Sequence, residues 1–371
     1  MISINVSNID FGESAKVIIT GGTSCSLQTK TVDITENGTT TVSPSANYDG
    51  LSSVVINVNV PNTGGGGSGI DFSIIGYNAE LSNELNAKFN ADVEYSKTLL
   101  DAWNPSNTSA NDLYEGDTQL VYAPNIDTSN CAYMNNMFSG CTSLTTVPEF
   151  DTSNCTQMNN MFNGCTSLTT VPEFDTSNCT HMLLMFNNCT SLTTVPEFDT
   201  SNCTSMATMF GNCEKLTTVP EFDTSNCTSM SQLFSGCKSL TTVPPFNTSK
   251  VENFRYAFAD CYELESLPLF DFSVVKSTSI EVFGISSTNF EKLTTLGGFK
   301  DLKYDWTGIY GLNRCPNLTY ESVMNVINNL YDFRSNGDSS TTRTLKLNAN
   351  SLALLTDDDK AIATSKGWVL S

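Results

Sequence analysis

The sequence predicts an α/β solenoid of leucine-rich-repeat type, preceded by a small all-β N-terminal module. The first observation is a 24-residue unit, CTQMNNMFNGCTSLTTVPEFDTSN in the copy from Cys155, that recurs almost verbatim between residues 131 and 274. The second is its constant step, which repeats methionine every 24 residues at Met137, Met161, Met185 and Met209. A fixed period in the twenties is typical of solenoids, in which each unit buries its apolar face only by stacking on its neighbours.

Each copy is predicted to form a short helix, a short strand and a turn. The first half places apolar side chains at i, i+3, i+4 and i+7, the spacing of one helical face, at Met158, Met161, Phe162 and Cys165. The polar residues before them suit a helix N-cap, and Gly164 suits a helix end. The LTTVPEF segment that follows is β-prone, with Leu168, Val171 and Phe174 expected to point inward.

The pattern MxxMFxxCxxLTxxPxFDTSN resembles the BspA-type leucine-rich repeat, which occurs in bacterial surface proteins and in phage-encoded tail and fibre proteins. The resemblance covers the repeats and implies a stack of coils. One departure is a cysteine where such repeats commonly carry Val, at Cys131, Cys155, Cys179, Cys203 and Cys227. Because Val251 fills this position in the sixth copy, we interpret these cysteines as small buried apolar residues.

Composition excludes several classes of partner. The 371 residues include 18 basic and 39 acidic residues, giving a net charge of −21 at pH 7, and no Lys/Arg cluster appears. We therefore expect neither nucleic acid nor an anionic membrane as partner, because both require basic patches. The first residues lack a basic region followed by an apolar one, and no long apolar run exists, so neither signal-directed export nor membrane insertion is expected.

Of the 13 cysteines, those in the repeats recur at periodic core positions rather than in an irregular disulfide framework. Stacked cysteines of one series would have parallel Cα–Cβ directions, which is poor disulfide geometry. We therefore predict reduced, buried thiols and assembly in a reducing bacterial cytoplasm.

Residues 1–60 are predicted to form the β module. Short β-prone runs (ISINV, KVIIT, KTVDI, TTTVS and LSSVVINVNV) follow one another, and Glu36, Asn37 and Gly38 form a hairpin signal. The segment resembles N-terminal modules of phage structural proteins, which implies attachment to other virion proteins. Because so short a chain makes a marginal core, we expect it to self-associate, and a homotrimer is favoured because fibres are commonly trimeric.

Residues 61–69, rich in glycine, are predicted to be a flexible linker. Residues 70–130 lack the period and are predicted to form a helical N-terminal cap, with apolar residues from Leu81 to Trp103 ending at Pro105.

Residues 275–371 are predicted to hold degenerate repeats and an α/β C-terminal cap, after a worn sixth copy from Val251. Helices are expected over 319–333 and 356–367, the second capped by Thr356 with Asp359 three residues later. TLKLN and WVLS are expected to be strands. This ending resembles the C-terminal cap of phage-encoded tail proteins that carry these repeats.

The sequence predicts no catalytic, cofactor or metal site. The one histidine, His181, stands at a variable position expected to be exposed. In the unit from Cys155, no basic group lies beside the cysteines to activate a thiol. Cys155 and Cys165 are too far apart in sequence for a zinc-finger pair.

Two polar ladders are candidate ligand-facing sites. They are formed by Thr145, Thr169, Thr193 and Thr217 and by Glu149, Glu173, Glu197 and Glu221. A parallel series of aspartates runs from Asp127 to Asp223. Stacked carboxylates repel one another, so they are predicted either to accept bonds from turn amides or to hold a cation such as Ca²⁺.

These observations favour a non-enzymatic phage virion surface protein, a tail or head fibre or an adhesin. Its binding face would recognise a host cell-surface glycan or protein, since a repetitive face suits a repetitive ligand. Two alternatives remain open: a bacterial cell-surface adhesin of the same repeat family, and a purely structural spacer or decoration protein. An enzyme would need converging acids in the irregular segments, where the sequence shows none.

Overall fold

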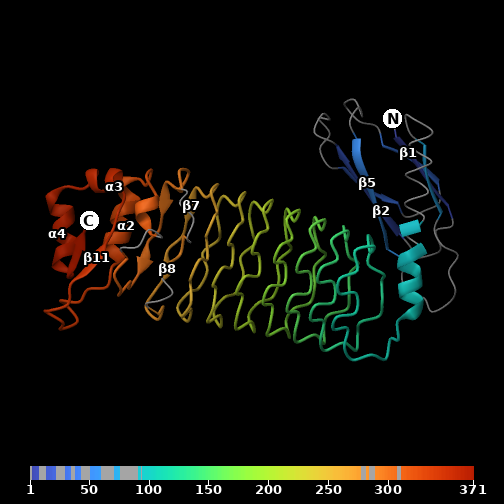
Figure 1. The fold of residues 1–371 in the computed structure, drawn as a ribbon, viewed down its shortest axis with the longest axis horizontal. Helices are drawn as coiled ribbons and strands as arrows, with labels where there is room; N and C mark the ends of the chain where they lie inside the picture. The colour runs from blue at the N-terminus through green and yellow to red at the C-terminus, as the bar shows by residue number, and fades with distance from the viewer. Residues whose placement is uncertain are drawn as a thin grey trace. The chain divides into compact units, whose positions relative to one another are not determined.

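The computed structural model describes the backbone of six strands within residues 2–75, and residues 91–92, 94–276, 281–283, 289–306 and 311–371. The chain divides into two compact units. The first contains Met1–Ser106, Thr118–Thr128 and Ser143–Phe150; the second contains Asn107–Asp117, Ser129–Thr142 and Asp151–Ser371. Figure 1 colours the chain from its blue N-terminal strands to its red C-terminal helices. The predicted linker, residues 61–69, lies outside the described residues.

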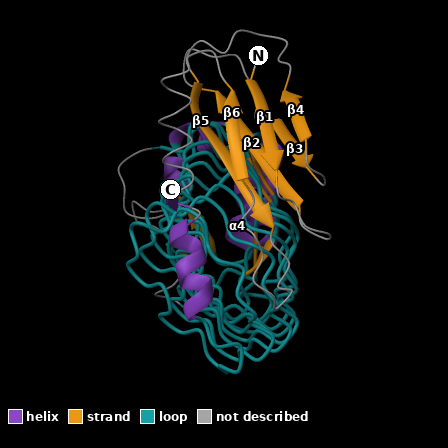
Figure 2. Cartoon of the chain, turned by 90° about the vertical axis from the view of Figure 1, so that its right-hand side faces the viewer, coloured by secondary structure: helices purple, strands orange, loops and turns teal. Residues whose placement is uncertain are grey.

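The N-terminal strands pair antiparallel in two three-stranded sheets, with strand orders β4-β1-β6 and β3-β2-β5 (Figure 2). The strands are β1 (Ile2–Ser7), β2 (Ser14–Gly21), β3 (Lys30–Ile34), β4 (Gly38–Val42), β5 (Leu51–Asn59) and β6 (Asp71–Ile75). The β-prone runs predicted within residues 1–60 all form strands. β6 comes from the segment that the sequence assigned to the helical cap.

The predicted hairpin around Glu36, Asn37 and Gly38 is wrong. β3 pairs with β2 and β4 pairs with β1, so the strands on either side of the turn belong to different sheets. The Asn-Gly signal expresses only a local preference for positive φ. The long-range pairing gives β1 and β2 a partner on each side.

Stacked coils begin at residue 107, earlier than the predicted boundary at 131. A parallel bridge joins Ser109 to Tyr133, and the Tyr114 ring centroid lies 5.4 Å from that of Phe138. Residues 107–117 are therefore a diverged first copy of the turn segment. Before them, residues 91–92 and 94–102 are helical, which agrees with the predicted helix end before Pro105. The predicted helical residues 81–90 lie outside the described residues.

The helix predicted in each copy is wrong. In its place the structure has consecutive turns, and the residue two after the first buried methionine adopts a positive φ, 54° at Asn136 and 56° at Asn160. A left-handed residue interrupts an α-helix. The helical spacing of the apolar residues arises because two tight turns of this kind also return side chains to one side at i, i+3, i+4 and i+7.

Backbone N–H groups in these turns alternate between two kinds of acceptor. Met158, Asn160, Phe162 and Gly164 donate to carbonyls 23 residues later, in the next coil, at 2.8–2.9 Å. The interleaved Met161, Asn163 and Cys165 donate within the coil, each to the carbonyl three residues earlier, at 3.0–3.3 Å. From Asn160 to Cys165, residues that donate to the next coil therefore alternate with residues that close turns within their own coil. Figure 1 shows these coils as the evenly spaced green and yellow loops.

The LTTVPEF segments do not form the predicted short strands, and only single backbone hydrogen bonds join them between copies. Its apolar residues point inward as predicted, with Leu168, Val171 and Phe174 buried. Between copies, Thr193 N–H donates to the Thr169 carbonyl at 3.1 Å. Strand pairs are defined only from the sixth copy onward, where β7 (Ser266–Leu267) pairs with β9 (Thr295–Leu296) and β8 (Phe270–Asp271) with β10 (Phe299–Lys300).

The core of the stack is a double column of phenylalanine rings. One column has centroids 5.5–5.7 Å apart and planes within 16° of parallel, and consists of Phe138, Phe162, Phe186, Phe210, Phe234 and Phe258. The other has centroids 6.3–6.4 Å apart and consists of Phe174, Phe198, Phe222 and Phe246. Each inner ring contacts copies before and after it, so removing one ring opens a cavity between coils.

The C-terminal cap follows the sequence closely. It contains η2 (Leu312–Arg314), α2 (Tyr320–Asn329), β11 (Arg343–Leu345), α3 (Ala349–Ala353), α4 (Asp357–Ser365) and β12 (Trp368–Leu370). Thr356 and Asp359 form the reciprocal bonds of a capping box, as predicted. β11 and β12 pair in parallel, and Trp368 is buried with its Nε1 donating to the Tyr331 carbonyl at 2.9 Å.

We predict that Phe186→Ala lowers the free energy of unfolding by about 3–5 kcal/mol, because it deletes a ring packed on both sides. Phe186→Leu should cost clearly less, since most of the volume is kept. Urea unfolding measures both. The exposed Thr194→Ala is the control from the same copy and should shift stability by less than about 0.5 kcal/mol. Equal effects at the two positions would contradict the ring column.

Candidate binding faces

Each DTSN segment closes a turn through its aspartate. The Oδ1 atom accepts the N–H of the serine two residues later, at 2.9–3.1 Å, in Asp151, Asp175, Asp199 and Asp223. Bonds from Ser177, its hydroxyl first, hold the pKa of Asp175 below its usual value. The N–H of Ser225 does the same to the pKa of Asp223. The sequence left open whether these aspartates accept bonds from turn amides or hold a cation, and the structure shows the bonds from turn amides.

The threonine and asparagine of the same segment bond the neighbouring coils. Thr200 Oγ1 is buried and donates to the Asp223 carbonyl at 2.8 Å, as Thr176 and Thr224 donate to the coils that follow them. Asn178 Nδ2 donates in the other direction, to the Ser153 carbonyl at 2.8 Å. Sequence reasoning did not single out these threonines, although their recurrence in every clean copy was a signal. This edge therefore serves the fold.

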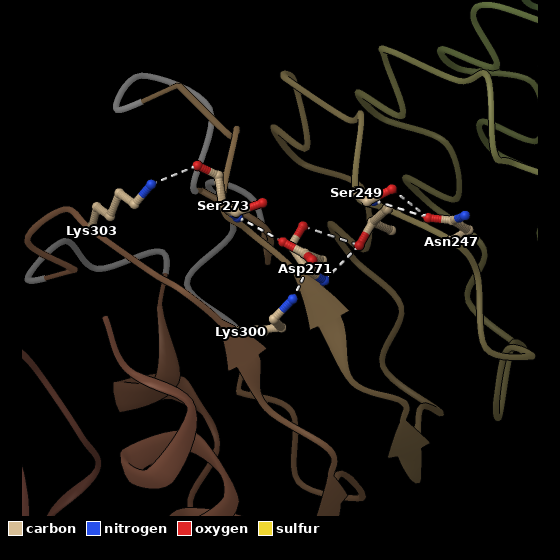
Figure 3. Close-up of polar contacts among 7 residues, drawn as sticks. Asn247, Ser249, Asp271, Ser273, Lys300 and Lys303 are labelled. Atoms are coloured by element: carbon tan, nitrogen blue, oxygen red, sulfur yellow. Dashed lines mark hydrogen bonds and ion pairs between the residues drawn. The ribbon is translucent and has the colours of Figure 1, made fainter. Parts of the chain in front are cut away.

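The charge pattern of this edge changes near its C-terminal end (Figure 3). Asn247 stands in the aspartate position and accepts bonds from Ser249 in the same way. Asp271 accepts the Ser273 N–H and the Lys300 Nζ, both at 2.9 Å. The repulsion between stacked carboxylates is thus relieved here by an amide and by a lysine.

The predicted threonine and glutamate ladders lie at the surface. Glu173, Glu197 and Glu221 are exposed in the second unit, with Thr169, Thr193 and Thr217. In the first unit Glu149 is exposed, and Thr145 is half-buried and donates its hydroxyl to the Val121 carbonyl at 3.1 Å. Thr193 Oγ1 likewise donates to the Thr169 carbonyl at 3.2 Å. These threonines therefore support the stack as well as facing outward.

Among the described residues, no group of three or more His, Cys, Asp or Glu side chains is arranged to hold a metal ion. Ca²⁺ binding at the glutamates stays a prediction.

A second outward column runs along the stack on another part of the coil. Parallel bridges join its residues from copy to copy, through Tyr133, Gln157, His181, Ser205, Ser229 and Asn253. His181 is exposed as predicted, but it lies in this bridged column rather than on a helix. Its Nδ1 lies 2.7 Å from Thr180 Oγ1.

The cysteines of the repeats are buried and free of disulfides, as predicted. A second series of cysteines lies ten residues after the first, and each Sγ in it donates to a carbonyl 27 residues earlier at 3.0–3.2 Å. These are Cys141, Cys165, Cys189, Cys213, Cys237 and Cys261. In the first series Cys155 donates to the Gln157 carbonyl at 3.4 Å. Burial raises the pKa of Cys155 to about 11 and that of Cys179 to about 12. These thiols are unsuited to nucleophilic chemistry.

The repeat region matches the family model described as "Mycoplasma protein of unknown function, DUF285", over residues 111–219 and 180–295. This span begins in the first diverged copy and ends in the worn copies, so it follows the stacked coils. The match supports the leucine-rich, BspA-like type of repeat predicted from the sequence.

A crystal structure of a leucine-rich repeat protein of T. pallidum (TpLRR) is similar to the chain. It is 20% identical, with a TM-score of 0.26, and the similarity covers 47% of this chain and 67% of that protein. No curated protein matches the sequence significantly. Within the described part of the chain, no helix is long and apolar enough to span a membrane.

We predict that Thr200→Val lowers the free energy of unfolding by about 1–3 kcal/mol, because the bond from the buried Thr200 hydroxyl to the Asp223 carbonyl is lost while the shape is kept. Thr193→Val is the matched control. The Thr169 carbonyl still accepts the Thr193 N–H in that variant, so the effect should be smaller. Urea unfolding of the two variants gives the comparison, and a larger loss for Thr193→Val would refute the role given to the buried threonines.

Alkaline pH should destabilise the stack. The unfolded thiols ionise near pH 9, whereas Cys155 keeps its proton to about pH 11. The native state then binds more protons, so stability falls with rising pH by about 1.4 kcal/mol per pH unit for each such thiol. Below pH 9 this contribution is fully present. Chemical unfolding across this range measures the slope, and Cys155→Val with Cys179→Val should make it less steep, because the other buried thiols still contribute. An unchanged slope would contradict buried, protonated thiols.

Proposed function

We propose that the chain is a non-enzymatic surface protein of a bacteriophage particle, a tail or head fibre or an adhesin, whose coils present a binding face to the host cell. The observation that carries this proposal is the uninterrupted internal column from Phe138 to Phe258. Because this core and the inter-coil bonds hold each coil in place, the outward side chains are free to be selected for binding.

A binding role also agrees with the chemistry of the coils. The cysteine thiols are buried and protonated, and His181 is exposed on the bridged column. Repeat proteins of this architecture use extended surfaces to recognise ligands. The proposal includes the solenoid architecture predicted for residues 131–274.

The phage setting rests on the sequence resemblance of both ends of the chain. In this proposal residues 1–60 attach the protein to other virion proteins and associate as a homotrimer, and the coils face a host glycan or protein. The protein would be assembled in the host cytoplasm and carried on the virion.

The experiment is immunogold labelling and mass spectrometry of purified particles, together with competition of particle adsorption by the isolated full-length chain. We expect labelling at one defined location and reduced adsorption in the presence of the chain. Particles from which the gene has been deleted are the control. Absence of the protein from wild-type particles would reject the proposal.

A further inference from the structure

The copies differ from one another at several positions, which include the third, fifth, sixth, ninth and twelfth residues of each copy. Four copies of LTTVPEF are identical, at 144–150, 168–174, 192–198 and 216–222. By contrast, the third and fifth residues of each copy change. We call these residues the variable strip: Tyr133, Gln157, His181, Ser205 and Ser229, with Asn135, Asn159, Leu183, Ala207 and Ser231.

The structure brings the variable strip together on one side of the coils. Parallel bridges place the third residues of successive copies side by side. The residue between the third and the fifth, Met158 or Met182, is buried. The third and fifth residues around it are half-buried or exposed, except Ala207, which is buried. Tyr133 is 43% exposed and Leu183 36% exposed. Asn135 Nδ2 donates to Gln157 Oε1 at 3.2 Å, which joins the two rows across copies.

The variable strip carries no charged residue, although the net charge of the chain is −21. The LTTVPEF segments contribute one exposed glutamate per copy, and the DTSN edge contributes one aspartate. The strip ends where Arg255 takes the fifth position and pairs with Glu281, Nε to Oε2, at 2.9 Å. The strip therefore offers no cation to an anionic ligand, and it holds no charge that a neutral ligand would have to desolvate.

The residue that follows the strip carries a backbone cost. The sixth residue of each copy has a positive φ, and the first two copies fill it with Asn136 and Asn160, which tolerate that conformation. Later copies place Leu184 at φ 58° and Thr208 at φ 57°. A β-branched residue is especially unfavourable there. Stability is therefore lost beside the strip at positions where asparagine would fit, which is a pattern found near functional surfaces.

We infer that the variable strip is the ligand-binding face and that its ligand is a neutral glycan lying along the coils. This inference rests on the proposed surface-binding function. Tyr133 offers a rigid amphipathic ring, and the amides, hydroxyls and imidazole offer hydrogen bonds to sugar hydroxyls without charge. Because the strip continues through successive coils, an extended polymer gains contacts from each one.

The test compares two full-length variants on an array of neutral and anionic polysaccharides. The strip variant combines Tyr133→Ala, His181→Ala and Leu183→Ser. The matched control changes the identical face, with Glu173→Gln, Glu197→Gln and Glu221→Gln. Circular dichroism and thermal unfolding show that both fold. We expect the natural chain to bind neutral glycans, the strip variant to lose at least about tenfold in affinity, and the glutamate variant to bind as the natural chain does.

Several results would overturn the inference. They are loss of binding in the glutamate variant with the strip variant unaffected, binding of anionic glycans alone, binding of host protein in place of glycan, and no binding at all. Particle labelling is independent of the array, so the proposed function can stand when this inference fails.

A second measurement addresses the backbone cost. Leu184→Asn with Thr208→Asn should raise the midpoint of thermal unfolding, because asparagine tolerates the positive φ at these two positions. An unchanged or lower midpoint would contradict the backbone cost.

Discussion

The structure depends on the way alternate backbone N–H groups are shared between coils. In the copy from Cys155, Met158, Asn160, Phe162 and Gly164 donate to the following coil. Met161 and Asn163 close turns, and the Asn159 N–H donates to Asn135 Oδ1 of the preceding coil. No coil can satisfy its own backbone, because half of these donors find acceptors only 23 residues later. This explains why the period is constant at 24: an extra residue in one coil would misplace every donor against the next.

The same constraint separates the parts of the coil that hold the stack from those that are free. The DTSN edge is occupied by turn and inter-coil bonds, as Thr200 and Asn202 show. The phenylalanines and cysteines fill the interior. Apart from the buried Ala207, the third and fifth residues have side chains that are half-buried or exposed. Residue type varies there, and under the proposed function a ligand is recognised where variation costs the stack least.

Much of the fold could be predicted from the sequence. The array, its inward residues and the capping box of α4 were all accessible, because each depends on local spacing. The turns were not, since Met158, Met161, Phe162 and Cys165 show the same spacing in a helix and in this coil. Positive φ at Thr208 has no signal in residue type, and the partner of β3 depended on distant strands. The Thr and Glu ladders could be predicted because the same residue recurs at a fixed period. The variable strip has no such signal, and only the structure places Tyr133, Gln157 and His181 side by side.

Hydrogen exchange of individual backbone amides tests the shared N–H groups most directly. The account predicts strong protection at Met158 and Asn160, because both donate to the next coil at 2.8–2.9 Å. A helix beginning at this point would leave these first-turn amides without partners and protect only the residues that follow. Slow exchange at Met158 and Asn160 agrees with stacked coils. Rapid exchange at both, with protection starting at Met161, would contradict the account.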